Sequence, residues 1–153
     1  MSTSKLAILG CGNIGSAIAK GLAKSGMTKA NITLTSRKSE SLSELTQAGF
    51  QTTAENADAV QNSEIILLTV GPGQLMDLLD EISSSLSGDH LLISIVSGVS
   101  ITEIQEKVGK EIPIIRAMPN TAAALCESMT CLSSLSQFTQ GLKTAQSLFE
   151  NVG

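Results

Sequence analysis

The sequence predicts an α/β fold of the Rossmann-like, doubly wound type, in which a mostly parallel sheet carries helices on both faces. Short aliphatic runs alternate with stretches of helical periodicity along the 153 residues. Several of these runs are apolar at every position, as parallel strands are when helices cover both faces. The first run leads directly into a glycine-rich turn and a helix. We therefore expect residues 1–153 to form a single domain.

The predicted strands are the short runs rich in Ile, Leu and Val. They are Leu6–Leu9, Ile32–Thr35, Ile65–Val70, Leu91–Val96 and Ile112–Arg116. The predicted helices lie between them, at Ile14–Ser25, Glu40–Ala48, Leu75–Leu86 and Ile101–Val108, with one more helix containing Leu142, Ala145 and Leu148. This alternation is typical of successive βαβ units.

Residues at the expected helix ends support these boundaries. Gly26 and Gly49 follow two predicted helices, where a left-handed residue commonly ends a helix. Ser100 and Glu103 have the spacing of a capping box ahead of Ile101–Val108. The capping residues and the apolar periodicity therefore agree.

Composition and charge exclude some kinds of partner. The net charge is −4, and the chain has no Trp, no Tyr and three Phe, which argues against a nucleic-acid-binding protein. The distribution of charge is uneven, because six Lys or Arg residues precede Glu40, the first acidic residue. The N-terminal segment would suit a small anionic ligand.

The cysteines indicate neither a disulfide framework nor a metal site. Cys11, Cys126 and Cys131 are odd in number and lack C-x-x-C spacing, so we expect buried free thiols, the last two packing near the last strand. The apolar runs are too short for a membrane span or a signal sequence. Together these features predict a cytoplasmic protein without a membrane partner.

The turn after the first strand carries the strongest motif. Gly10, Gly12 and Gly15 have the spacing G-x-G-x-x-G between a strand and a helix. In dinucleotide-binding folds, the first glycine permits the tight turn, the second admits the pyrophosphate and the third lets helix and strand pack closely. We therefore predict a dinucleotide site here. The alternative is a tight turn without a ligand.

The end of the second strand indicates which dinucleotide is bound. NAD-preferring sites normally carry an acidic residue there, which would repel a 2′-phosphate. This chain has Ser36, Arg37 and Lys38 instead, which offer a hydroxyl and two cations. The prediction is NADP(H), with NAD(H) as the second choice.

Other reactive side chains have ordinary structural interpretations. His90 lies at the amino-terminal side of the sheet, away from the predicted site, and is expected at the surface. Cys11 is expected to pack as a small residue beneath the cofactor. Arg116 lies within a strand pattern, where an edge position or an ion pair is expected. Asn120 is either a ligand-binding donor or a turn residue. No catalytic or metal-binding residue is predicted.

The chain resembles the pyrroline-5-carboxylate reductase family. Leu9–Ile14 is similar to the family's G-x-G-N-M glycine loop, and Asn56 stands ahead of the third predicted helix at a matching place. Ser94–Val99 resembles its I-S-x-x-A-G-V segment. Arg116–Thr121 resembles its R-x-M-P-N-T segment, the most distinctive match. The resemblance covers essentially the whole chain, but only the N-terminal half of the family.

This resemblance implies an NADPH-dependent reductase that converts 1-pyrroline-5-carboxylate, a cyclic imine carboxylate, to L-proline. It also implies a homo-oligomeric full-length form, and it leads us to expect that the family's helical dimerisation and substrate domain is absent here. The implied cofactor-binding residues are Leu9, Gly10, Cys11, Gly12, Asn13 and Ile14 at the diphosphate, Ser36, Arg37, Lys38 and Asn56 at the adenosine end, and Val70, Gly71, Pro72, Ser97, Gly98, Met118, Pro119 and Asn120 toward the nicotinamide and substrate.

Some residues depart from the family pattern. Gly71 stands where the family's V-K-P segment has Lys, Ala122 where Pro is usual, and Cys126–Ser128 where the family reads G-E-G. Two alternatives therefore stay open. One is another NADP-dependent dehydrogenase, of the β-hydroxyacid type, and the other is a dinucleotide-binding module without catalytic activity.

Overall fold

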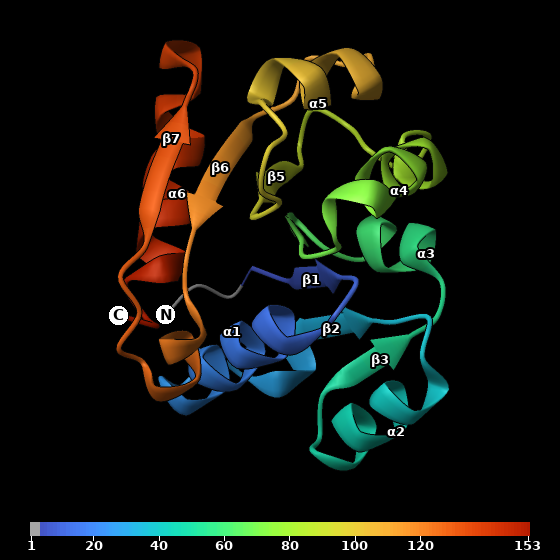
Figure 1. Cartoon of the computed structure of the whole chain (residues 1–153), viewed down its shortest axis with the longest axis vertical. Coiled ribbons are helices and arrows are strands. Elements are labelled where there is room, and N and C mark those ends of the chain that lie inside the picture. The colour runs from blue at the N-terminus through green and yellow to red at the C-terminus, as the bar shows by residue number, and fades with distance from the viewer. Residues whose placement is uncertain (1–3) are drawn as a thin grey trace.

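The computed structural model describes residues 4–153. Their strands form one seven-stranded sheet in the order β3-β2-β1-β4-β5-β6-β7 (Figure 1). The strands are β1 Leu6–Leu9, β2 Ile32–Thr35, β3 Gln51–Thr53, β4 Ile65–Leu68, β5 Leu91–Ser94, β6 Ile114–Met118 and β7 Cys131–Ser134. All neighbours pair in parallel except β6 and β7, which are antiparallel. The predicted Rossmann-like fold, mostly parallel and doubly wound, is confirmed.

Helices cover both faces of this sheet. In the described residues they are α1 Asn13–Lys24, α2 Ser39–Gln47, α3 Asn56–Gln61, α4 Leu75–Ile82, α5 Ile101–Val108 and α6 Thr139–Phe149. Short 3₁₀ helices lie at η1 Lys29–Asn31, η2 Pro72–Gln74, η3 Thr121–Leu125 and η4 Ser136–Phe138. Buried side chains of α1, α2 and α6 share one apolar cluster, and those of α3, α4 and α5 share another.

Alternation along each strand builds these two clusters. In β1, Leu6 and Ile8 face the α1 side, whereas Ala7 and Leu9 face the α4 side. All four of these residues are fully buried. The sheet is therefore rigidly packed on both faces, and the loops that follow its strands are held at fixed positions along one edge.

The predicted strands and helices are present, with altered ends. The strands predicted to reach Val70 and Val96 end at Leu68 and Ser94, because the chain leaves the sheet earlier to form loops. The strand predicted at Ile112–Arg116 is shifted to Ile114–Met118, and the helix predicted to Leu86 ends at Ile82. The capping box of Ser100 and Glu103 is confirmed, as are the positive φ angles of Gly26 and Gly49.

Among the strands and α-helices, β3, α3 and β7 were not predicted, and neither were the short 3₁₀ helices. Strand β3 has three residues, none of them buried, and β7 alternates exposed with half-buried positions. Helix α3 has only six residues, of which Ala59 and Val60 are buried. Each is too short or too polar to give a clear apolar pattern.

Candidate dinucleotide site

The glycine loop lies at the carboxyl end of β1, where the turn requires glycine at its first position. Gly10 has φ +79°, and a Cβ atom there would lie 2.2 Å from Cγ1 of Val70. A Cβ on Gly15 would lie 2.8 Å from Oγ1 of Thr69 and 3.2 Å from Cγ2 of Ile8. These two glycines therefore let β1, the loop after β4 and α1 approach one another closely.

Gly12 has a different environment from Gly10 and Gly15. It is exposed, and apart from its neighbours along the chain no residue has an atom within 4 Å of the position that its Cβ would occupy. It is also the N-cap of α1, without any side-chain cap and with no acidic residue in the first helical turn. The uncapped N–H groups of α1 therefore border open space, which is the arrangement that a dinucleotide pyrophosphate requires.

Cys11 is part of the framework of this loop. Its side chain is 4% exposed, its N–H donates to the carbonyl of Thr35 at 2.7 Å, and its Sγ lies 3.4 Å from Oγ of Ser16. Burial raises the pKa of the thiol, while the contact with Ser16 and the charge of Lys20 oppose that shift. This agrees with the interpretation of Cys11 as a small packing residue.

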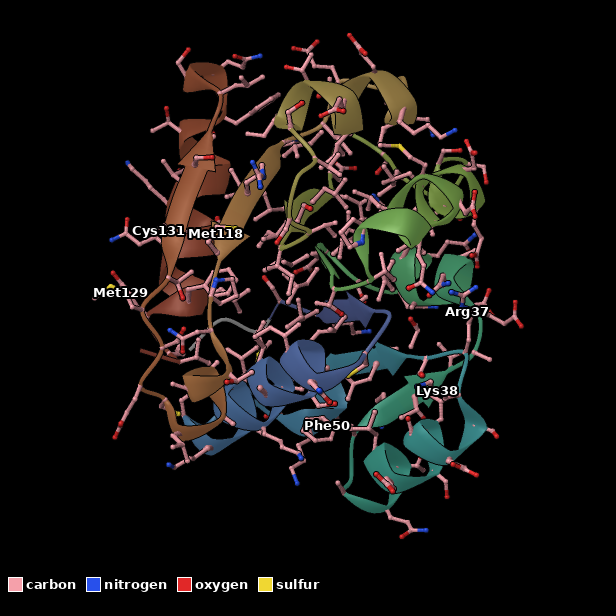
Figure 2. The ribbon with its side chains drawn as sticks, viewed as in Figure 1. Arg37, Lys38, Phe50, Met118, Met129 and Cys131 are labelled. Atoms are coloured by element: carbon pink, nitrogen blue, oxygen red, sulfur yellow. The ribbon has the colours of Figure 1, made fainter. Side chains whose placement is uncertain are left out.

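The residues after β2 form an exposed cationic turn. Ser36 is half-buried, and its Oγ accepts a hydrogen bond from the N–H of Lys38 at 3.1 Å. The salt bridge found within residues 4–153 joins Lys107 and Asp80, so neither Arg37 nor Lys38 is ion-paired there. Figure 2 shows Arg37 beside α3 and Lys38 nearer α2. Both cations remain available to an anionic group.

Asn56 is joined to the glycine loop through a residue that the sequence analysis missed. Oγ1 of Thr35 accepts from the N–H of Gly10 at 3.1 Å and donates to Oδ1 of Asn56 at 2.6 Å. Thr69 is a second missed residue, since its hydroxyl donates to the carbonyls of Leu9 and Gly10 at 2.9 and 3.1 Å. Both residues could have been found in the sequence, because Thr35 ends an apolar strand and Thr69 directly follows one.

The loops after β4 and β5 lie at the same edge of the sheet. Gly71 and Pro72 are exposed, and the N–H of Gly71 donates to Oε1 of Gln74 at 3.4 Å. Ser97 and Gly98 are also exposed, with open space around Gly98. Because β1, β2, β4, β5 and β6 run in parallel, their following loops meet along one edge, where this fold binds its ligands.

The segment after β6 also lies at the carboxyl ends of the parallel strands. Met118 is 50% exposed, and Pro119 is half-buried. Oδ1 of Asn120 accepts from the N–H of Ala122 at 3.0 Å and caps η3, while its Nδ2 lies 3.5 Å from the carbonyl of Met129. In this structure the amide of Asn120 therefore acts as a turn residue.

Two expectations about other side chains were wrong, namely those for Arg116 and for the burial of Cys126, which is half-buried, and Cys131. Arg116 lies on β6, between β5 and β7 rather than at an edge, and its buried Nε has no hydrogen-bond partner. His90 does not contradict the expected surface position, since it is half-buried and folds back over a turn, with Nδ1 accepting from the N–H of Ser87 at 2.9 Å. Cys131 is exposed, because it begins the edge strand β7.

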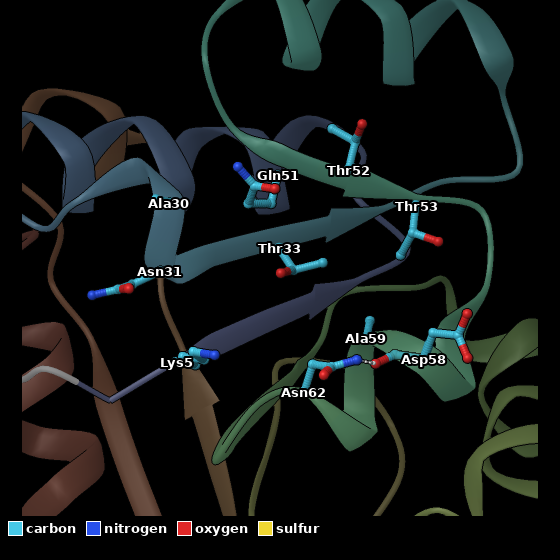
Figure 3. Close-up of a pocket in the computed structure, with 10 residues that line it drawn as sticks. All are labelled: Lys5, Ala30, Asn31, Thr33, Gln51, Thr52, Thr53, Asp58, Ala59 and Asn62. Carbon is cyan, nitrogen blue, oxygen red and sulfur yellow. Dashed lines mark hydrogen bonds between the residues drawn. The ribbon is translucent and has the colours of Figure 1, made fainter.

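Two cavities of the described chain lie away from the loops that follow the parallel strands. One cavity of about 350 Å³ lies at the amino ends of β1, β2 and β3 (Figure 3). Its lining includes Lys5, Asn31 and Gln51, at the starts of those strands. The candidate dinucleotide site is instead an open surface around Gly12. No group of metal-binding side chains and no helix suited to span a membrane occurs in residues 4–153.

Comparisons with known proteins agree with this fold and motif. Residues 5–98 match the family model described as NADP oxidoreductase, coenzyme F420-dependent. Pyrroline-5-carboxylate reductase 1 of Dictyostelium discoideum is 49% identical over 84% of this chain and 23% of its own length. Pyrroline-5-carboxylate reductase 2 of the same organism is 40% identical over 95% of the chain and 50% of its own length.

A solved structure shows the same relation. Pyrroline carboxylate reductase of Plasmodium falciparum, with NADP bound, superposes with a TM-score of 0.89 and 28% identity over all of this chain and 56% of its own. The chain thus spans about half or less of the length of these proteins. It belongs to the NADP oxidoreductase family that the matching model describes, and it is similar to pyrroline-5-carboxylate reductases over that part of their length.

Proposed function

We propose that this chain is the dinucleotide-binding domain of an NADPH-dependent reductase that converts 1-pyrroline-5-carboxylate to L-proline. The observation that carries the proposal is the open space at Gly12, bordered by the uncapped N-terminus of α1. The relatives named above support the reaction and substrate, and the structural relative was solved with NADP bound.

Different residues in the loops after the parallel strands would contact different parts of the cofactor. The loop Leu9–Ile14 would hold the diphosphate, since the uncapped N–H groups at the start of α1 border the open space at Gly12, whereas those of Gly10 and Cys11 are bonded to Thr35. Arg37 and Lys38, exposed and without an ion pair in the described chain, would bind the 2′-phosphate with Ser36. Asn56 would contact the adenosine portion. The remaining residues implied by the resemblance, which are Val70, Gly71, Pro72, Ser97, Gly98, Met118, Pro119 and Asn120, would border the nicotinamide.

The reaction would depend on positioning more than on acid–base catalysis. When bound, NADPH supplies the hydride that reduces the C=N bond. A cyclic imine that arrives protonated is already electrophilic at carbon, so the chain's task is to hold the two partners in contact and to limit water. Met118, half-exposed at the end of β6, provides an apolar wall for this purpose. We assign no catalytic residue within this chain.

A second function is favoured by one feature of the site. Gly71 lacks the cation that the family's V-K-P segment would place beside the ribose. A Cβ atom added to Gly71 would lie 3.8 Å from Oε1 of Gln74 and would otherwise face open space. A chain that binds the dinucleotide but does not turn it over would tolerate this loss. Substituting Gly71→Lys tests the point, because a reductase would gain cofactor affinity from the added cation.

The test of cofactor binding is a calorimetric titration of this chain with NADPH and NADH. We expect NADPH to bind at least about tenfold more tightly, equivalent to about 1.4 kcal/mol. Arg37→Ala should remove most of this preference, whereas Lys143→Ala, which removes an exposed cation on α6, should not. Equal affinities would refute the NADP preference. No binding of either dinucleotide would refute the proposed function for this chain.

Location and assembly form part of the same proposal. Cys11, Cys126 and Cys131 are free thiols, which fits the reducing cytoplasm. We propose a small-molecule substrate and no nucleic-acid partner, in line with the net charge of −4. We also propose that the full-length form is a homo-oligomer. Sedimentation of the longest natural form would test that assembly directly.

A further inference from the structure

A chain of hydrogen bonds connects the glycine loop to helix α4. The N–H of Gly10 donates to Oγ1 of Thr35 at 3.1 Å, and that hydroxyl donates to Oδ1 of Asn56 at 2.6 Å. Nδ2 of Asn56 donates to both carboxylate oxygens of Glu81, at 3.1 and 3.2 Å. Three separate segments of sequence thus meet at Asn56, and α3 and α4 lie side by side in Figure 1.

The directions of these hydrogen bonds fix the orientation of the Asn56 amide. Thr35 is 1% exposed, and its hydroxyl accepts from Gly10, so its single proton is free to go to Asn56. The carboxylate of Glu81 can only accept. If the amide were turned over, its oxygen would face the carboxylate of Glu81 and its nitrogen would face Thr35. Glu81 therefore holds the nitrogen of Asn56 on its own side.

The fixed orientation determines what Asn56 can offer a ligand. Its oxygen accepts one hydrogen bond, from Thr35. Its nitrogen carries two protons, and a single N–H directed between the two carboxylate oxygens of Glu81 accounts for both contacts, which leaves the second N–H for another acceptor. Asn56 is half-buried and begins α3, and Arg37 lies beside the same helix in Figure 2. The fixed orientation thus leaves the second N–H of the amide as a donor for a group bound near the cationic turn.

We propose that Glu81 is a positioning residue of the dinucleotide site, which orients Asn56 as a hydrogen-bond donor to the adenosine half and steadies the first N–H of the glycine loop through Thr35. This inference rests on the proposed function, because it takes the ligand to be NADPH. The groups that a donor would recognise are acceptors, such as a ring nitrogen of adenine or an oxygen of the ribose or its phosphate. Glu81 itself need not touch the cofactor.

The first experiment measures NADPH affinity by calorimetry in Glu81→Ala, Asn56→Ala and the double variant. Glu81 is exposed, so we expect Glu81→Ala to weaken binding by about fivefold. In the Asn56→Ala background the same substitution should have no further effect, because its action passes through Asn56. Glu106→Ala, which removes an exposed carboxylate from α5, serves as the control and should bind as the unsubstituted chain does.

Two results of this titration would overturn the proposal. One is unchanged affinity in Glu81→Ala, and the other is an undiminished effect of Glu81→Ala in the Asn56→Ala background. A merely structural role would instead weaken binding equally with and without Asn56. Failure of the unsubstituted chain to bind NADPH is a separate outcome, which counts against the proposed function.

A second measurement tests the hydrogen-bond chain without any ligand. In ¹H–¹⁵N NMR spectra, Glu81→Ala should shift the side-chain amide signals of Asn56 and the backbone signal of Gly10, whereas Glu106→Ala should leave both in place. Unmoved signals in Glu81→Ala would overturn the positioning role, whether or not the cofactor binds. Thermal unfolding of each variant shows that the fold is retained.

Discussion

Substitution of the three loop glycines separates folding from cofactor binding. Gly12→Ala adds a methyl group that meets no atom of a residue distant in the chain within 4 Å, so we expect the free energy of unfolding to change by less than about 0.5 kcal/mol. The same methyl group would project into the space where the pyrophosphate lies against the backbone. NADPH affinity should therefore fall by at least about tenfold, or about 1.4 kcal/mol.

Gly10→Ala and Gly15→Ala should behave in the opposite way. At Gly10 the new Cβ would overlap Cγ1 of Val70 at 2.2 Å, with φ at +79°. At Gly15 it would lie 2.8 Å from Oγ1 of Thr69, a buried side chain. We expect each to lose about 1–3 kcal/mol of stability, and Gly10 more than Gly15 because of its φ angle.

Urea denaturation and NADPH titration of the three variants would check both expectations. The essential result is a Gly12→Ala variant that is stable yet binds poorly. If Gly12→Ala binds NADPH like the unsubstituted chain, no phosphate lies against Gly12, and our argument from the open space is wrong. If Gly10→Ala is as stable as the unsubstituted chain, the tight turn is not constrained as the geometry indicates.

Three further outcomes follow from single residues. Cys126→Gly should raise the free energy of unfolding by about 1 kcal/mol, measured by urea denaturation, because Cys126 has φ +64° and a glycine relieves that strain. Lower stability would contradict this and would mean that the contact of Sγ of Cys126 with the carbonyl of Gly21, at 3.4 Å, contributes more than the strain costs. Cys131 is exposed, whereas the thiol of Cys11 is buried and has a raised pKa, so Cys131 should react with a maleimide at least about tenfold faster. Mass spectrometry would follow both reactions, and equal rates would contradict this expectation. The hydrogen bonds from Ser100 lower the pKa of Glu103, so the Glu103→Gln variant should be less stable than the unsubstituted chain at neutral pH. The difference in stability should disappear as the pH falls through that lowered pKa. A difference in thermal unfolding that does not depend on pH would show that the charge of Glu103 is not its cause.

The sequence was sufficient for the elements with strong apolar patterns. Strand β1 and helix α5 begin and end at the predicted residues, because a fully buried strand and a capped amphipathic helix leave clear signals. Strand β7 escaped prediction because it lies at the edge of the sheet and carries exposed residues such as Cys131 and Ser133. Edge strands bury one side at most, so their composition approaches that of a loop.

The predicted site residues were placed by motif, but their connections were not. The glycine loop and the cationic turn do lie at one edge, as parallel strand order requires. The bonds from Thr35 to Asn56 and from Asn56 to Glu81 join residues 21 and 25 positions apart, which no local pattern encodes. Arg116 shows the same limit, because its neighbours depend on β7, which was itself not predicted.

The thin anchoring of α2 has a consequence for local unfolding. Leu45 is the single buried residue of that helix, and the following β3 has none, although both lie next to the turn that holds Arg37 and Lys38. Amide protons of this corner should exchange with solvent through local opening, well before the strands at the centre of the sheet expose theirs. A ligand bound to the cationic turn would then protect the amide protons of α2 and β3 from exchange more than those elsewhere, because ligand binding would be coupled to the local folding of this corner.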